Sequence, residues 1–116
     1  MNDEQMEWTA SWIAALESGE YCQTTGALRK DGGYCCMGVA ADLLNPMGWR
    51  TVEGKEYWQD AHMEAVPYVE IKSVSGLPLF FLFTLPEMND EGHDFLKIAQ
   101  TIRERAGFDT KTTRKI

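Results

Sequence analysis

The stretch QTTGALRKDGGYCCMGVAAD, residues 23–42, contains the clearest change of secondary-structure pattern in this chain. Residues 24–28 favour a first β-strand, and Lys30-Asp31-Gly32-Gly33 supplies residues that accept the positive φ angles of a tight turn. Tyr34 and Cys35 are then expected to return as an antiparallel second strand. The stretch therefore predicts a β-hairpin.

The same stretch passes from strand to helix at its two adjacent cysteines. Small and apolar residues run from Cys36 to Leu44, which predicts a short buried helix that Asn45-Pro46 ends. Gly38 and the alanines leave room for a neighbouring backbone to approach closely. We expect the amides at the start of this helix, near Met37, to be able to bind an anion such as a phosphate by donating hydrogen bonds to it.

Two longer helices are expected near the ends of the chain. The first begins at Asn2 or Asp3 and ends before Gly19, and we expect its aromatic stripe to lie on the sheet. The second is capped by Asp94 and ends at Gly107. The apolar stripes comprise Trp8, Trp12, Ile13 and Leu16 in the first helix and Phe95, Ile98, Ala99, Ile102 and Ala106 in the second.

The segments between these elements are less clearly patterned. Trp49 to Val52 and Tyr68 to Val74 alternate apolar and polar residues, as half-buried strands do. Residues 77–85 are apolar and predict buried structure, but their length does not distinguish helix from strand. We expect Pro86 to end this segment and residues 88–92 to form a polar loop.

Together these patterns predict one α+β domain, residues 1–108. A small antiparallel sheet of hairpins packs with an N-terminal helix, a short central helix and a C-terminal helix. A chain of 116 residues is near the commonest domain size, and its 44% hydrophobic content suffices for one core. Residues 109–116 are expected to form a basic, flexible C-terminal tail.

The charge distribution bears on the kind of partner. The chain carries a formal net charge of −7, yet residues 103–116 are mainly basic, so the preceding body is the acidic part. A duplex-binding protein presents a basic face, so direct binding of duplex nucleic acid by this body is not expected. No apolar run is long enough to span a bilayer, and we expect no membrane partner.

The three cysteines, Cys22, Cys35 and Cys36, suggest a reduced, cytoplasmic protein, because the count is odd and the N-terminus has no export-signal pattern. Cys36 is the alternative catalytic residue, since a helix N-terminus lowers a thiol pKa and His62 or His93 could complete a Cys–His pair. The default interpretation is that the thiols are buried. No metal-binding spacing and no phosphate or dinucleotide motif is present, so neither a metal nor a cofactor is expected.

Polar residues in the hairpin and near Asn89-Asp90 predict a different use. Their donors and acceptors suit a planar polar ligand such as a nucleotide. The alternative interpretation is that Gln23 and Asn89 satisfy backbone groups in turns. The candidate ligand-binding residues are Gln23, Thr25, Arg29, Tyr34, Asn89 and Asp90.

An acidic run gives a second class of hypothesis. Glu53, Glu56, Asp60 and Glu64 follow one another at near-helical spacing. One acidic face of this kind is suited to docking on a basic host protein, in which case the chain is a protein–protein inhibitor. The alternative is an ordinary solvated face.

The chain also resembles a family of small uncharacterised proteins of tailed bacteriophages and prophages. The residues that carry the resemblance are Trp12, Leu16–Tyr21, Gln23, Gly26, Leu28, Gly33–Val39, Asp42, Asn89-Asp90, Phe95, Ile98-Ala99 and Ile102. The resemblance implies a phage setting, in which such proteins often bind host or defence components. Our leading hypothesis is a non-enzymatic binding protein that sequesters a small ligand, such as a nucleotide signal, or blocks a host defence component.

Overall fold

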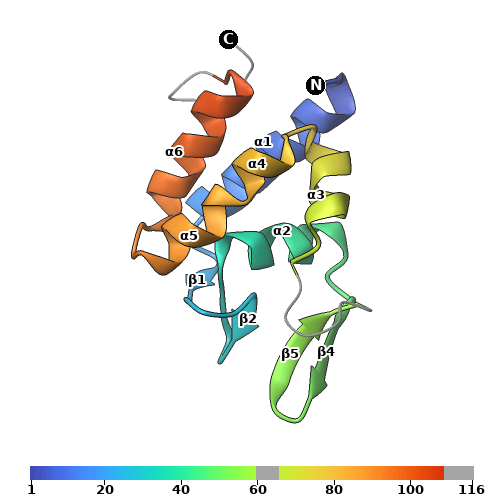
Figure 1. The fold of residues 1–116 in the computed structure, drawn as a ribbon, viewed down its shortest axis with the longest axis vertical. Helices are drawn as coiled ribbons and strands as arrows, with labels where there is room; N and C mark the ends of the chain where they lie inside the picture. Colours follow the sequence, from blue (N-terminus) through green and yellow to red (C-terminus); the bar gives the residue numbers. More distant parts are fainter. Residues whose placement is uncertain (60–65, 109–116) are drawn as a thin grey trace.

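The computed structural model describes residues 1–59 and 66–108 (Figure 1). The elements are, in chain order, α1 (Asp3–Glu17), β1 (Cys22–Gln23), β2 (Arg29–Lys30), β3 (Gly33–Tyr34), α2 (Cys36–Leu44), β4 (Trp49–Val52), β5 (Lys55–Trp58), α3 (Tyr68–Ser75), α4 (Leu79–Leu82), α5 (Thr84–Asp90) and α6 (Phe95–Ala106). The predicted α+β class with a small sheet is confirmed.

The strands form two small sheets. The first has the order β1-β3-β2 and the second is the hairpin of β4 and β5. β2 and β3 are antiparallel, as expected, but β1 pairs with β3 in parallel, with Gln23 opposite Tyr34. The expected strand over residues 24–28 is wrong, because Gly26, at a φ of 78°, turns the chain between β1 and β2.

Both hairpins close through two residues with positive φ. Asp31 and Gly32 have φ angles of 52° and 81°, and Glu53 and Gly54 have 51° and 82°. Positive φ at both central residues is the signature of the type I′ turn, whose twist matches that of the flanking strands. The first turn was predicted from its Asp-Gly sequence, whereas the pairing of residues 49–52 with β5 was not.

Three helices begin and end where their capping residues predict. The Asn2 side chain accepts a hydrogen bond from the Gln5 amide, and the Gln5 side chain accepts one from the Asn2 amide, so α1 starts with a capping box. The Asp94 side chain caps α6 by accepting a hydrogen bond from the Lys97 amide, and Gly107 ends the helix in the left-handed conformation. α2 follows the small-residue run as expected.

The hydrophobic core lies among the helices, and Figure 1 shows the two small sheets below them. α1 packs along α6, α3 and α2, so the expectation that it lies on the sheet is wrong. Its Trp12 side chain is fully buried, and the indole Nε1 donates to the Cys36 carbonyl oxygen at 3.1 Å. This bond joins α1 to α2 and provides the buried indole with an acceptor.

Two further expectations are corrected. Residues 68–75 form helix α3 rather than a strand, because Ile71 and Ser75 are buried one helical turn apart and Gly76 provides a left-handed C-cap. The apolar segment 77–85, which the sequence assigns to neither helix nor strand, contains α4 and the start of α5. Pro86 does not end it, because Pro86 is in the first turn of α5, where an amide has no acceptor within the helix.

The basic end of the chain is partly structural. Arg103 on α6 is 4% exposed, and its two terminal nitrogens donate to the two carboxylate oxygens of Glu17 at 2.6 and 2.7 Å. This bidentate pair fastens the end of α6 to the end of α1. The predicted tail, residues 109–116, lies outside the described residues. None of the described helices is by itself long and apolar enough to cross a membrane.

Gly38 on α2 provides a test of the packing. A Cβ atom at this position would collide with the carbonyl group of Leu28, 2.8 Å from its carbon atom. We predict that Gly38→Ala lowers the free energy of unfolding by about 3 kcal/mol, measured by urea denaturation, because a clash with backbone cannot be relieved by a rotamer change. Helix propensity alone predicts that the same substitution raises the free energy of unfolding by about 1 kcal/mol.

The exposed helical residue Ala14 provides the matched control. Ala14→Gly measures the propensity difference without a packing change and should cost about 1 kcal/mol. A Gly38→Ala protein as stable as the wild type would contradict the close approach of α2 to Leu28.

Candidate functional site

The side chain of Asn89, on α5, is fully buried and has three hydrogen bonds. Its Oδ1 accepts from the Cys36 amide at 3.1 Å and from Gln23 Nε2 at 3.0 Å. Its Nδ2 donates to the Thr24 carbonyl oxygen at 2.7 Å. One carboxamide thus fastens α5 to the start of α2 and to the loop after β1.

Gln23 extends this network towards α6. Its Nε2 also donates to the His93 carbonyl oxygen at 2.8 Å, and its Oε1 accepts from the Phe95 amide at 3.1 Å. Nearby, Asp90 Oδ1 accepts from the Gly26 amide at 3.0 Å. Gln23, Asn89 and Asp90 therefore form hydrogen bonds with backbone groups. For Gln23 and Asn89 this is the alternative to ligand binding that the sequence left open.

The other candidate residues lie elsewhere. Thr25 is exposed in the loop between β1 and β2. Arg29 and Tyr34 are directly opposite each other on β2 and β3. The Arg29 guanidinium lies over the ring of Tyr34, 5.4 Å from its centroid, and over the ring of Trp49 at 5.1 Å. The candidate ligand-binding residues thus do not form one site. Gln23, Asn89 and Asp90 hold parts of the backbone together, whereas Arg29 lies on aromatic rings.

Asp42 of α2 supports the rings beneath Arg29. Its Oδ2 accepts from the Tyr21 hydroxyl at 2.7 Å and its Oδ1 from Trp49 Nε1 at 3.0 Å. Tyr34 packs edge-on against both Tyr21 and Trp49. We call Tyr21, Tyr34 and Trp49 the aromatic cluster.

The aromatic cluster keeps its hydroxyl groups protonated. Burial, followed by the hydrogen bond to Asp42, raises the pKa of Tyr21 far above its usual value. Burial also raises the pKa of Tyr34, an effect that Asp42 increases and Arg29 partly offsets. The cluster is therefore a neutral support for the cationic guanidinium.

A groove of about 490 Å³ opens beside Arg29. One wall is the segment 26–32, which includes the first hairpin turn, and the other is formed by Thr51 and residues 54–56 of the second hairpin. An ion pair between Arg29 Nε and Glu56 Oε1, 2.9 Å apart, joins the two walls. We call this space the hairpin groove.

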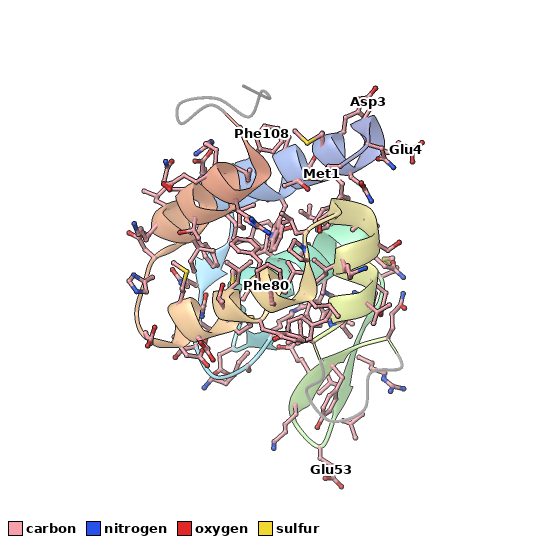
Figure 2. The ribbon with its side chains drawn as sticks, turned by 45° about the horizontal axis from the view of Figure 1, so that its top comes forward. Met1, Asp3, Glu4, Glu53, Phe80 and Phe108 are labelled. Carbon is pink, nitrogen blue, oxygen red and sulfur yellow. The ribbon has the colours of Figure 1, made fainter. Side chains whose placement is uncertain are left out.

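The predicted acidic face is not gathered among the described residues. Glu56 points to Arg29 in the ion pair, whereas Glu53 is at the tip of the β4–β5 hairpin, away from the helices (Figure 2). Asp60 and Glu64 lie outside the described residues. The near-helical spacing predicts one acidic face only if these residues form a helix. Glu53 is instead in the hairpin turn and Glu56 is on β5.

Cys35 and Cys36 are both buried, and Cys36 has no exposed surface. Burial raises the pKa of the Cys35 thiol and, more strongly, that of Cys36. A nucleophilic cysteine has the opposite properties, namely an accessible thiol with a lowered pKa. Of the histidines proposed to complete a Cys–His pair, His62 lies outside the described residues.

The start of α2 also lacks the free amides of an anion site. The Cys36 amide donates to Asn89, and the Gly38 amide donates to Cys35 Sγ at 3.3 Å, so the thiol of Cys35 is a helix cap. These buried amides already have acceptors, and the expected anion site is not open there. Among residues 1–59 and 66–108, no group of three or more His, Cys, Asp or Glu side chains could hold a metal ion.

Comparison with known proteins places the chain in a family. The model of a domain of unknown function, DUF8296, matches residues 4–78, well over half of the chain. The chain belongs to this family. No curated protein and no solved structure gives a significant match.

The DUF8296 match includes the whole hairpin groove, which is lined by residues 26–32, Thr51 and residues 54–56, and the aromatic cluster beneath Arg29. Asn89 and Asp90 follow the matched segment. Sequence analysis missed the supporting role of Asp42 and Trp49 and the pairing of Arg29 with Glu56. The Glu53-Gly54 dipeptide between two short alternating runs was the available signal for the second hairpin.

We predict that Asn89→Ala lowers the free energy of unfolding by about 3 kcal/mol, because the Cys36 amide and the Thr24 carbonyl lose their buried partner. Chemical denaturation measures this loss. Asn45→Ala is the matched control, since within residues 1–59 and 66–108 the Asn45 side chain accepts a hydrogen bond only from the exposed Met47 amide, and it should cost less than about 1 kcal/mol. Equal losses in the two variants would contradict the role assigned to Asn89.

Proposed function

We propose that this protein is a non-enzymatic binding protein that sequesters a small anionic ligand of the nucleotide class in the hairpin groove. The observation that carries the proposal is the groove itself, with Arg29 held on the aromatic cluster at its wall. Its volume of about 490 Å³ is in the range of small-molecule sites.

The charge of the groove supports an anionic ligand. Its lining contains three basic residues, Arg29, Lys30 and Lys55, and two acidic ones, Asp31 and Glu56. The chain as a whole has a net charge of −7, so a lining with more basic than acidic residues differs from most of its acidic body. A phosphate group is therefore attracted more to this groove than to the acidic parts of the surface.

We infer binding rather than catalysis from the state of the cysteines. Cys36, the nucleophile considered from the sequence, is fully buried with a raised pKa. Cys22, Cys35 and Cys36 are free thiols, which fits a reducing compartment, and we propose that the protein acts in the cytoplasm.

The resemblance to small phage and prophage proteins supplies the proposed setting. A binding protein that removes a signal nucleotide of the host deprives a defence system of its activator without needing turnover. This role requires that the ligand be held tightly in the cell of the host.

We predict that one member of a panel of mono-, di- and cyclic nucleotides raises the melting temperature of the protein. A ligand at 100 times its dissociation constant adds about 2.7 kcal/mol, which corresponds to roughly 10 °C or more for a domain of this size. Differential scanning fluorimetry at millimolar ligand measures the shift. The nucleosides serve as uncharged reference compounds.

Arg29→Gln should remove most of the shift, because Arg29 is the wall residue held on the aromatic cluster. Arg50→Gln is the matched control, since Arg50 is exposed on β4 and does not line the groove, and it should leave the shift unchanged. Flat melting curves across the whole panel would refute the proposed function.

A further inference from the structure

The ion pair between Arg29 and Glu56 joins the two walls of the groove, but it is not needed to stabilise them. The two side chains are 30% and 22% exposed, and an ion pair at such exposure contributes little to stability. The guanidinium is already supported from below by the rings of Tyr34 and Trp49. Glu56 is therefore not needed to keep Arg29 in position.

The ion pair uses only one side of the guanidinium. Glu56 Oε1 contacts Nε, and arginine has five N–H donors in a planar fork. No hydrogen bond from Arg29 Nη1 or Nη2 is found within residues 1–59 and 66–108. These terminal nitrogens are the donors that bind a phosphate oxygen pair in bidentate geometry.

We propose that the hairpin groove recognises a phosphate group through the terminal nitrogens of Arg29, and that Glu56 is a built-in competing carboxylate that lowers the affinity. The inference rests on the proposed function and specifies the contact and its regulation. A phosphate bound to Arg29 lies within a few ångströms of the Glu56 carboxylate, so the two negative charges repel each other across a partly exposed site.

The competition has a functional consequence. Because the internal carboxylate neutralises Arg29 in the empty groove, weakly charged anions gain little by entering it. A ligand with several negative charges, such as a diphosphate, gains more from the basic lining than it loses to Glu56. The ion pair thus weakens the binding of anions in general, and a ligand needs several contacts with the basic lining to offset that loss.

Glu56→Gln separates charge from geometry. The glutamine keeps the size and shape of the side chain and an oxygen near Arg29 Nε, but it has no negative charge. Glu53→Gln is the matched control, because it removes the same charge from the same hairpin at the tip of its turn, and Glu53 does not line the groove. Arg29→Gln removes the proposed phosphate contact itself.

Isothermal titration calorimetry of the full chain with inorganic pyrophosphate and with ADP tests the inference. We expect Glu56→Gln to bind pyrophosphate about tenfold more tightly than the wild type at low salt, with a smaller gain at high salt. Glu53→Gln should remain within about twofold of the wild type, because its carboxylate is farther away and exposed. Arg29→Gln should lose at least about tenfold.

Each contrary outcome has a defined meaning. Equal pyrophosphate affinities for Glu56→Gln and Glu53→Gln would overturn the competing role of Glu56. Nucleotide binding that Arg29→Gln does not weaken would overturn the phosphate contact while leaving a binding function in place. Absence of pyrophosphate binding to both the wild type and Glu56→Gln overturns the inference, whereas the proposed function fails only if no nucleotide of the panel binds.

Discussion

The buried carboxamide of Asn89 is the interaction on which the arrangement of this domain depends. It satisfies the first amide of α2, the carbonyl oxygen of Thr24 and the Gln23 side chain, which in turn binds the start of α6. Each of these groups is at an element boundary, where regular secondary structure leaves polar atoms without partners. One side chain therefore sets the position of the first sheet relative to three helices.

The hairpin groove depends on that arrangement. β3 leads directly into α2, so fixing the start of α2 also fixes the strand that carries Tyr34. Asp42, further along α2, then holds Tyr21 and Trp49 around the same ring. Through Asp42, α2 thereby holds the rings beneath Arg29, and the second hairpin supplies one of these rings, Trp49, as well as the outer wall.

Local signals made part of this structure predictable. α1, α2 and α6 were found because capping residues and helical periodicity act within a few residues of one another. The parallel pairing of β1 with β3 and the ion pair of Arg29 with Glu56 join residues far apart in sequence, which a single sequence does not reveal. The carboxamide side chains of Gln23 and Asn89 predicted that both residues form several hydrogen bonds, and both do. Their partners, however, are backbone groups that only the fold brings within reach.

Amide chemical-shift mapping shows directly whether the ligand binds in the hairpin groove. ADP is titrated into isotopically labelled protein, and two-dimensional NMR spectra report which backbone and side-chain amides respond. We expect the largest shifts in residues 26–32, Thr51 and residues 54–56, with the Asn89 and Gln23 side-chain amides unchanged because their hydrogen bonds remain within the protein. Largest shifts at those two side chains, or no shifts at all, would contradict binding in the hairpin groove.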